Sequence, residues 1–263
     1  MTKIKDIIRE IEKFAPKCLQ EDYDNVGLMV GDDEKEVKRV LLSLDCTNDA
    51  IEEATNLKCD LMITHHPLFF RKPKRIVKKD LLGNKVINLI KEDITLYSCH
   101  TNLDSAKDGI NETIVKMLGF NSCITLEPNE SRNYKEDGIG RLIKLDNPIS
   151  LNNLVDLIKN TLNINNMKIV KGNEKVTTLA IINGSGQDLF PLAKSFGADC
   201  IITGDTTYHF ALDYKEMGIS IIDAGHFSTE YIAFLKTLEF LKKEFNDVEF
   251  MASKTCQDPY EFA

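Results

Sequence analysis

The feature that most constrains this chain is an alternation of short apolar runs with amphipathic stretches. Residues 40–44 and 61–63 are apolar, and between them apolar side chains recur at helical spacing at residues 51, 54 and 57. A short apolar run, an amphipathic helix and a second short run are typical of a βαβ unit. Because the pattern returns later in the chain, we predict an α/β protein of two α/β lobes, each with a mixed sheet flanked by helices.

The expected elements divide between these two lobes. The stretch 127–138 is polar and rich in turn-forming residues, so we place the boundary there, with lobes 1–126 and 127–263. In the first lobe the pattern predicts helices over 4–14, 80–92 and 109–118, a helix after Thr47 as N-cap, and strands over 40–44, 61–63 and 94–97. In the second it predicts strands over 140–145, 167–170, 179–183, 201–202 and 219–223, and helices over 151–162, after 188 and over 229–244.

A weak internal similarity links the lobes. A shift of 139 positions aligns residues 41–64 with 180–203 and pairs Asp60 with Asp199 and Thr64 with Thr203. Any two βαβ units share such a pattern, so common local patterning explains the similarity as well as duplication does.

Composition excludes several classes of partner. The chain has 263 residues, a net charge of -8 and no run of apolar residues long enough to span a bilayer, so we expect a soluble protein without a membrane partner and consider nucleic acid an unlikely one. Its 7 cysteines form no C-x-x-C pair and lie mostly in apolar runs, which indicates buried free thiols in the reducing cytoplasm.

Histidines and carboxylates cluster where predicted strands end. His65 and His66 follow the strand at 61–63, at the end of a strand where α/β sheets place their ligands. Adjacent side chains of a strand project to opposite sides, so we expect this pair to serve two metals more readily than one. His100 and Asp104 follow the strand at 94–97, although Asp104 in a turn or helix cap would explain that segment as well.

A third cluster follows the strand at 219–223. His226 and Glu230 are four residues apart and share a helical face if the helix has begun there. Together the three clusters form a nitrogen and oxygen ligand set without thiolates, which suits two zinc, iron, manganese or nickel ions rather than a structural zinc site. We therefore predict a dinuclear metal site formed by His65, His66, His100, Asp104, His226 and Glu230.

Five segments together carry a family resemblance that covers essentially the whole chain. They are DYDNVGLMVG at 22–31, ITHHPLFF at 63–70, HTNLD at 100–104, GSG at 184–186 and GHFSTE at 225–230. The chain resembles the Nif-three-like dinuclear-metal family, whose members are named GTP cyclohydrolase I type 2 homologues.

The resemblance implies metals in the cleft between two lobes and a ring-shaped homohexamer. Carried over by position, the ligands fall on His65, His66, Asp104, His226 and Glu230, with Asp104 and Glu230 able to bridge. His100 matches a motif histidine that is either a ligand or an outer residue.

Three further features have two interpretations each. Residues 71–79 are rich in Lys and Arg and would attract phosphate beside the metals, although such runs are usually solvated loops. The GSG loop allows its N–H groups to face an anion, and a tight turn explains it equally well. His209 is either a base or substrate contact in the cleft or an exposed helix residue.

The leading hypothesis is a metal-dependent hydrolase acting on a nucleotide or another small phosphorylated substrate, with two divalent metal ions as cofactors. In this hypothesis, His100 or His209 transfers protons during the reaction. A GTP cyclohydrolase reaction rests on the resemblance alone. The alternative is a non-enzymatic hexameric scaffold that binds or handles metal for a protein partner.

Overall fold

The computed structural model describes residues 1–129 and 134–262 of the protein. The chain forms two compact units: unit 1 contains residues 1–103 and 234–257, and unit 2 contains residues 104–233 and 258–263. The boundary expected at residues 126 and 127 lies inside a strand of unit 2, and part of the polar stretch around it, residues 130–133, lies outside the described residues. The division differs from the expected one because the C-terminal segment returns to unit 1 and adds a strand to its sheet.

Unit 1 is built around a five-stranded mixed sheet of order β1-β4-β3-β2-β11. The strands β2, β3, β4 and β11 are parallel, and β1 pairs antiparallel with β4. Its elements are α1 (Ile4–Phe14), η1 (Lys17–Leu19), β1 (Gly27–Val30), β2 (Arg39–Ser43), α2 (Asn48–Asn56), β3 (Leu61–Thr64), α3 (Leu81–Lys91), β4 (Thr95–Ser98), α10 (Phe240–Glu244) and β11 (Glu249–Ala252).

Unit 2 contains a six-stranded mixed sheet of order β5-β6-β8-β9-β10-β7. The strands β8, β9 and β10 are parallel, whereas β5, β6 and β7 pair antiparallel with their neighbours. Its elements are α5 (Ile110–Met117), β5 (Ile124–Pro128), β6 (Gly138–Ser150), α6 (Leu151–Leu162), β7 (Lys168–Val170), β8 (Lys175–Ile181), η2 (Gln187–Leu189), α7 (Phe190–Ser195), β9 (Cys200–Thr203), α8 (Tyr208–Glu216) and β10 (Ser220–Asp223). Two of the points where the chain changes unit lie in helices, α4 (Thr101–Ser105) and α9 (His226–Thr237), and a third lies after residue 257.

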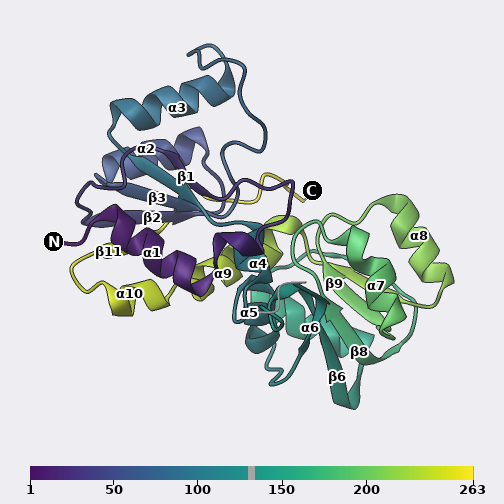
Figure 1. The fold of residues 1–263 in the computed structure, drawn as a ribbon. Coiled ribbons are helices and arrows are strands. Elements are labelled where there is room, and N and C mark those ends of the chain that lie inside the picture. The colour runs from purple at the N-terminus through teal and green to yellow at the C-terminus, as the bar shows by residue number, and fades with distance from the viewer. Residues whose placement is uncertain (130–133, 263) are drawn as a thin grey trace. The chain divides into compact units, whose positions relative to one another are not determined.

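Helices cover both faces of each sheet (Figure 1). In unit 1, α2 and α3 lie on one face, and α1 and α10 lie on the other, where the rings of Phe14 and Phe240 are 5.0 Å apart. In unit 2, α7 and α8 cover one face, and α5 and α6 cover the opposite face. Each sheet is therefore buried on both sides, which explains why its parallel strands are continuous apolar runs in the sequence.

The predicted fold class is confirmed, and most predicted elements are present. Thr47 is the N-cap of α2, and its hydroxyl accepts a hydrogen bond from the N–H of Ala50 at 3.0 Å. Five strands and α-helices were not predicted: β1, α4, β5, α8 and β11. The long helix expected over 229–244 is two helices, α9 and α10. The strand β11 carries little local signal because it forms only by parallel pairing with β2, far away in the sequence.

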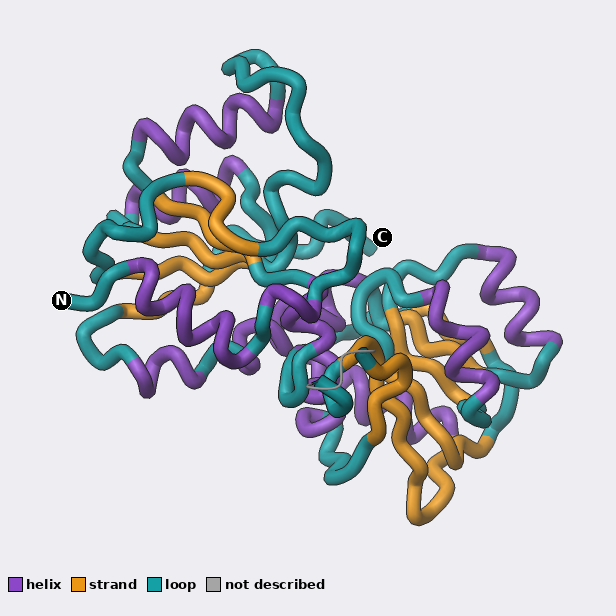
Figure 2. The backbone as a smooth tube through the Cα atoms, viewed as in Figure 1, coloured by secondary structure: helices purple, strands orange, loops and turns teal. Residues whose placement is uncertain are grey.

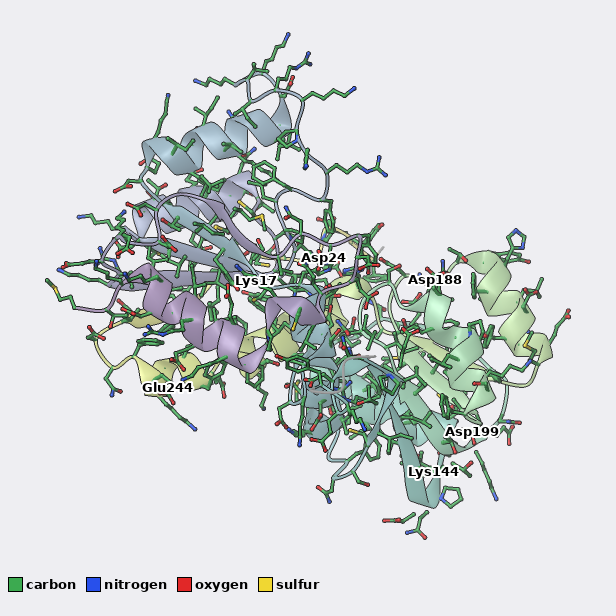
Figure 3. The ribbon with its side chains drawn as sticks, in the orientation of Figure 1. Lys17, Asp24, Lys144, Asp188, Asp199 and Glu244 are labelled. Atoms are coloured by element: carbon green, nitrogen blue, oxygen red, sulfur yellow. The ribbon has the colours of Figure 1, made fainter. Side chains whose placement is uncertain are left out.

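The internal similarity extends to hydrogen bonds in the structure. The Asp60 carboxylate accepts a bond from the N–H of Arg39 at 3.1 Å, while its own N–H donates to the Arg39 carbonyl at 2.9 Å. Asp199, labelled in Figure 3, makes the same reciprocal pair with Thr178, at 3.3 and 3.0 Å. Both pairs obey the shift of 139 positions, and each joins a strand (β2 or β8) to the residue just before its parallel neighbour (β3 or β9). These equivalent contacts favour duplication over common local patterning.

Most of the cysteines are buried, as their positions in apolar runs predicted. All 7 cysteines are free; Cys46, Cys59, Cys99 and Cys200 are buried, Cys123 and Cys256 are partly buried, and Cys18 is exposed. Burial raises the pKa of Cys46 to about 12 and that of Cys59 to about 11, so these thiols are protonated at neutral pH.

Within the described residues, every helix is too short or too polar to cross a bilayer.

Candidate metal centre

Three histidines of unit 1 meet at the carboxyl ends of two adjacent strands. His65 and His66 directly follow β3, and His100 comes two residues after β4, which pairs in parallel with β3. Each histidine offers one ring nitrogen to a cluster in which these nitrogens lie within 4.8 Å of one another. Such a group could hold a divalent metal ion.

The expected divergence of His65 and His66 is not seen. Their ring centroids are 5.1 Å apart, and each ring also lies close to that of His100, at 5.0 and 5.4 Å. The alternation of a pleated strand does not apply to this pair, because β3 ends at Thr64. Both imidazoles can therefore serve one cluster.

The Nδ1 atom of each of these histidines has an oxygen acceptor. His65 Nδ1 lies 2.9 Å from the carbonyl oxygen of Cys99, and His66 Nδ1 lies 2.9 Å from a carboxylate oxygen of Asp45. Since a carbonyl oxygen only accepts hydrogen bonds, the proton of neutral His65 is on Nδ1, and its Nε2 carries the lone pair that a metal needs. A ring held in this way is typical of metal ligands.

The acceptor for His100 is a buried carboxylate. The side chain of Asp24, labelled in Figure 3 on the segment between η1 and β1, is 0% exposed and lies 2.9 Å from His100 Nδ1. Burial alone would raise the pKa of Asp24, but hydrogen bonds from His100, Thr101 and Asn25 outweigh it and hold the pKa at about 2. Asp24 is therefore ionised at neutral pH and fixes the proton of His100 on Nδ1.

In unit 2, His226 and Glu230 occupy the first turn of α9. The helix begins at His226, directly after Gly225, whose φ of +88° makes the sharp exit from β10. Residues four apart share a helical face, and His226 Nε2 accordingly lies 3.0 Å from Glu230 Oε2. His226 Nδ1 lies 2.7 Å from Asp205 Oδ2. The helical geometry expected for this pair is confirmed.

Asp104 and Glu230 share a hydrogen-bond donor in unit 2. Asn183, which follows β8, places its Nδ2 atom 2.8 Å from Asp104 Oδ1 and 3.3 Å from Glu230 Oε1. Both acidic residues are buried, at 7% and 3% exposure, and the amide is neutral. Two buried carboxylates held this close repel each other, and a divalent cation would offset that charge.

The GSG loop has a steric role in this arrangement. Gly184 has a φ of +57°, and a Cβ atom at this position would lie 2.1 Å from Glu230 Oε1. Its N–H donates to the hydroxyl of Thr229 at 3.1 Å, so that group is already occupied. The loop thus fits the tight-turn interpretation, and glycine is required because the Glu230 carboxylate takes the space of a side chain.

The structure supports the predicted residues to different degrees. His65, His66 and His100 converge in unit 1, and Asp104, His226 and Glu230 gather around Asn183 and Asp205 in unit 2. His209 is exposed on α8, where its ring lies 5.5 Å from Tyr208, and within the described residues no hydrogen bond joins it to a candidate ligand. This position fits the exposed-helix interpretation.

Four supporting residues were missed in the sequence: Asp24, Asp45, Asp205 and Asn183. Asp24 lies within the quoted segment DYDNVGLMVG, and Asn183 directly precedes the quoted segment GSG. Their partners are 21 to 79 residues away, and no spacing rule reports a contact over that separation.

The chain is similar to proteins of one family along its whole length. The family model described as Duf34/NIF3 (NGG1p interacting factor 3) matches residues 2–259. A Clostridium perfringens protein named GTP cyclohydrolase 1 type 2 homolog is 50% identical over 262 residues, which are 99% of this chain and 99% of the relative. A Clostridium acetobutylicum protein of the same name is 46% identical to this chain, and the match covers 99% of this chain and 98% of the relative. The crystal structure of the Staphylococcus aureus hypothetical protein SA1388 superposes with a TM-score of 0.90 at 29% identity, covering 99% of both chains.

Proposed function

The chain belongs to the Duf34/NIF3 family, and from this premise we propose that it is a metal-dependent hydrolase with a dinuclear centre. The ligands in the proposal are His65, His66, Asp104, His226 and Glu230. A pair of divalent ions, when bound, lowers the pKa of water and stabilises negative charge that develops on an attacked group.

The observation that carries the proposal is the shared orientation of the motif histidines. In all four cases Nδ1 lies 2.7 to 2.9 Å from an oxygen acceptor, which is a carboxylate for three rings and a carbonyl for the fourth. Histidines that bind metal almost always donate their other ring N–H to a carboxylate, a backbone carbonyl or water, and all four rings fit this pattern. The donor set of imidazoles and carboxylates without thiolate fits zinc, iron, manganese or nickel.

We propose that Asp104 and Glu230 would supply the carboxylate ligands of the centre. Chain connectivity supports this: Asp104 follows His100 by four residues through α4, the helix in which the chain changes unit. Glu230 lies in α9, the helix in which the chain returns. Carboxylates are the usual bridging groups between two divalent ions.

Proton transfer is assigned to His100. Its Nδ1 proton is held by the ionised Asp24, so Nε2 is the atom that accepts a proton from water or returns it to a leaving group. An imidazole fixed by a buried carboxylate is the arrangement that hydrolases use for a general base. His209 is exposed and has no comparable partner among the described residues, so we assign it no step.

The basic loop supports a phosphorylated substrate. No helix or strand interrupts the chain between Thr64 and Leu81, as Figure 2 shows, and long irregular loops of this kind are usually functional. The loop starts beside His100: the ring of Phe70 lies 5.6 Å from the His100 ring, and Asn25 donates a hydrogen bond to the Phe69 carbonyl at 2.6 Å. All its cations are exposed in a chain of net charge -8: Arg71, Lys72, Lys74, Arg75, Lys78 and Lys79.

A phosphate ester or nucleotide fits this combination of cations and metal ligands. GTP is included in the proposal because the relatives are named GTP cyclohydrolase 1 type 2 homologs. We also propose that the protein is cytoplasmic and forms a homohexamer. Light scattering on the purified protein tests the oligomeric state: a mass of six times 29.8 kDa supports the hexamer, and the mass of a monomer contradicts it.

The test of the function compares His66→Ala and Glu230→Ala with the wild type. Purified proteins are loaded with zinc, iron, manganese or nickel and assayed against GTP, other nucleotides and phosphodiesters. We expect metal-dependent turnover in the wild type and its loss in both variants, because each removes a ligand. Loss in His100→Ala but not in His209→Ala would support the assignment of proton transfer, and the reverse result would move that role to His209.

A second comparison tests the loop. Lys72→Gln with Lys74→Gln should raise KM at unchanged kcat, while Lys242→Gln with Lys243→Gln, two exposed cations of α10, should change neither. Absence of turnover with every metal and substrate would favour a non-enzymatic, metal-binding scaffold. Tight, steeply salt-dependent binding of an oligonucleotide through the loop would favour nucleic acid instead.

A further inference from the structure

We propose that Asn183 is a positioning residue that sets the metal affinity of the unit 2 ligands by holding the two carboxylates through one amide. The inference rests on the proposed metal function. A single Nδ2 atom carries two hydrogens, and in this structure one lies toward Asp104 and the other toward Glu230.

The two bonds select which oxygen of Glu230 remains for a metal. Asn183 takes Oε1, whereas the other oxygen, Oε2, is the one that lies 3.0 Å from His226 Nε2. The carboxylate is thus oriented so that Oε2 and the histidine nitrogen can share an ion. Loss of the amide removes one hydrogen bond that fixes this orientation, and the pair would lose part of its preorganisation.

Asn183 is itself held rigidly. Its N–H donates to Asn111 Oδ1 at 3.1 Å, and Asn111 Nδ2 donates to the main-chain oxygen of Asp104 at 3.2 Å. All of these groups are buried, and Asn183 follows β8 at the interior of the sheet. The network therefore links the end of β8 to α4 and α5. Among the hydrogen bonds that the structure describes, the Asn183 amide is the one side-chain group that donates to both carboxylates.

Gly184 completes the arrangement from the other side. The absent Cβ at this position leaves the space that Glu230 Oε1 occupies. Consecutive residues of one turn thus act on the same carboxylate oxygen, Asn183 by a hydrogen bond and Gly184 by leaving room for it.

The experiment compares Asn183→Leu with Ser220→Ala in the full chain. Leucine has the same number and branching of side-chain heavy atoms as asparagine but no donor, so Asn183→Leu removes both carboxylate bonds and adds a little bulk. Ser220→Ala is the control, because it removes a buried hydroxyl of unit 2 whose described hydrogen bonds are to Gly172 and Asn173. Affinity for Zn²⁺ and Mn²⁺ is measured by chelator competition, and the melting temperature of each metal-free protein is measured alongside.

We expect Asn183→Leu to weaken metal binding by about 10- to 100-fold, which is the usual effect of losing an outer partner of a metal ligand. Ser220→Ala should lower the melting temperature but keep the affinity within about threefold. Wild-type affinity in Asn183→Leu would overturn the inference, and so would an equal loss in Ser220→Ala, since the effect would then follow fold stability.

Asn183→Ala adds no bulk and repeats the test should leucine prevent folding; the same loss is expected, and wild-type affinity again overturns the inference. If the wild type itself binds neither metal, the proposed function fails and this inference fails with it. If the wild type binds metal and the Asn183 variants do so equally well, only the inference fails.

Discussion

The close approach of Gly184 to Glu230 gives the sharpest prediction about the site. In Gly184→Ala the new Cβ would lie 2.1 Å from Glu230 Oε1, whereas ordinary contacts are longer than about 3.4 Å, so the carboxylate must move by about 1 Å. A displacement of this size takes a ligand oxygen out of bonding range, and we expect metal affinity to fall by about 100-fold, or about 2.7 kcal/mol.

A second glycine provides the control for backbone strain. Gly184 has a φ of +57° and Gly218 a φ of +74°, so alanine should cost each position about 1–2 kcal/mol of stability. A Cβ at Gly218 meets nothing within 4 Å, and Gly218→Ala should therefore bind metal like the wild type.

The assay is chelator competition for Zn²⁺, combined with thermal unfolding of the metal-free proteins. The reasoning is refuted if Gly184→Ala keeps wild-type affinity, or if Gly218→Ala loses affinity to the same extent. In the second case, strain in unit 2 rather than contact with Glu230 would explain the loss.

Three further predictions concern stability and thiol reactivity. The pKa of Asp24, about 2, lies below the ordinary value of about 3.9, so its contribution to stability is complete above about pH 5 and is lost as the pH falls towards 2. Urea unfolding is measured in the presence of a chelator, so that both proteins are free of metal. The free energy of unfolding of Asp24→Asn should be lower than that of the wild type at pH 7 and nearly equal to it at pH 2. The same difference at both pH values would contradict this. Thr47→Ala should lose about 1 kcal/mol, because it removes the N-cap of α2, while unchanged urea unfolding would argue against the cap. A maleimide should label Cys18 rapidly and Cys46 only on unfolding, as mass spectrometry can show; early labelling of Cys46 would contradict its burial.

The sequence located the candidate ligands more readily than the residues that hold them. His65, His66, His100, His226 and Glu230 follow strands whose apolar runs are unmistakable, and their position after a strand end is a local property. Helical spacing also predicted that His226 and Glu230 would meet.

The supporting residues and the division of the chain could not be predicted in this way. Asn183 and Asp104 are 79 residues apart, and their contact depends on how β8 packs in the finished sheet. The same holds for β11, which joins unit 1 only through pairing with β2. We expected the side chains of His65 and His66 to point to opposite sides, as neighbours in a strand do. This expectation failed because β3 ends at Thr64, so neither histidine lies in a strand.

The most direct test of the dinuclear centre is the metal content of the protein itself. Wild type, His66→Ala and Glu230→Ala are purified without added metal, equilibrated with each divalent ion, freed of excess and analysed by inductively coupled plasma mass spectrometry. The proposed centre predicts close to two ions per chain in the wild type and fewer in both variants. A wild type that retains no ion with any metal tested, or variants that retain as many as the wild type, would contradict it.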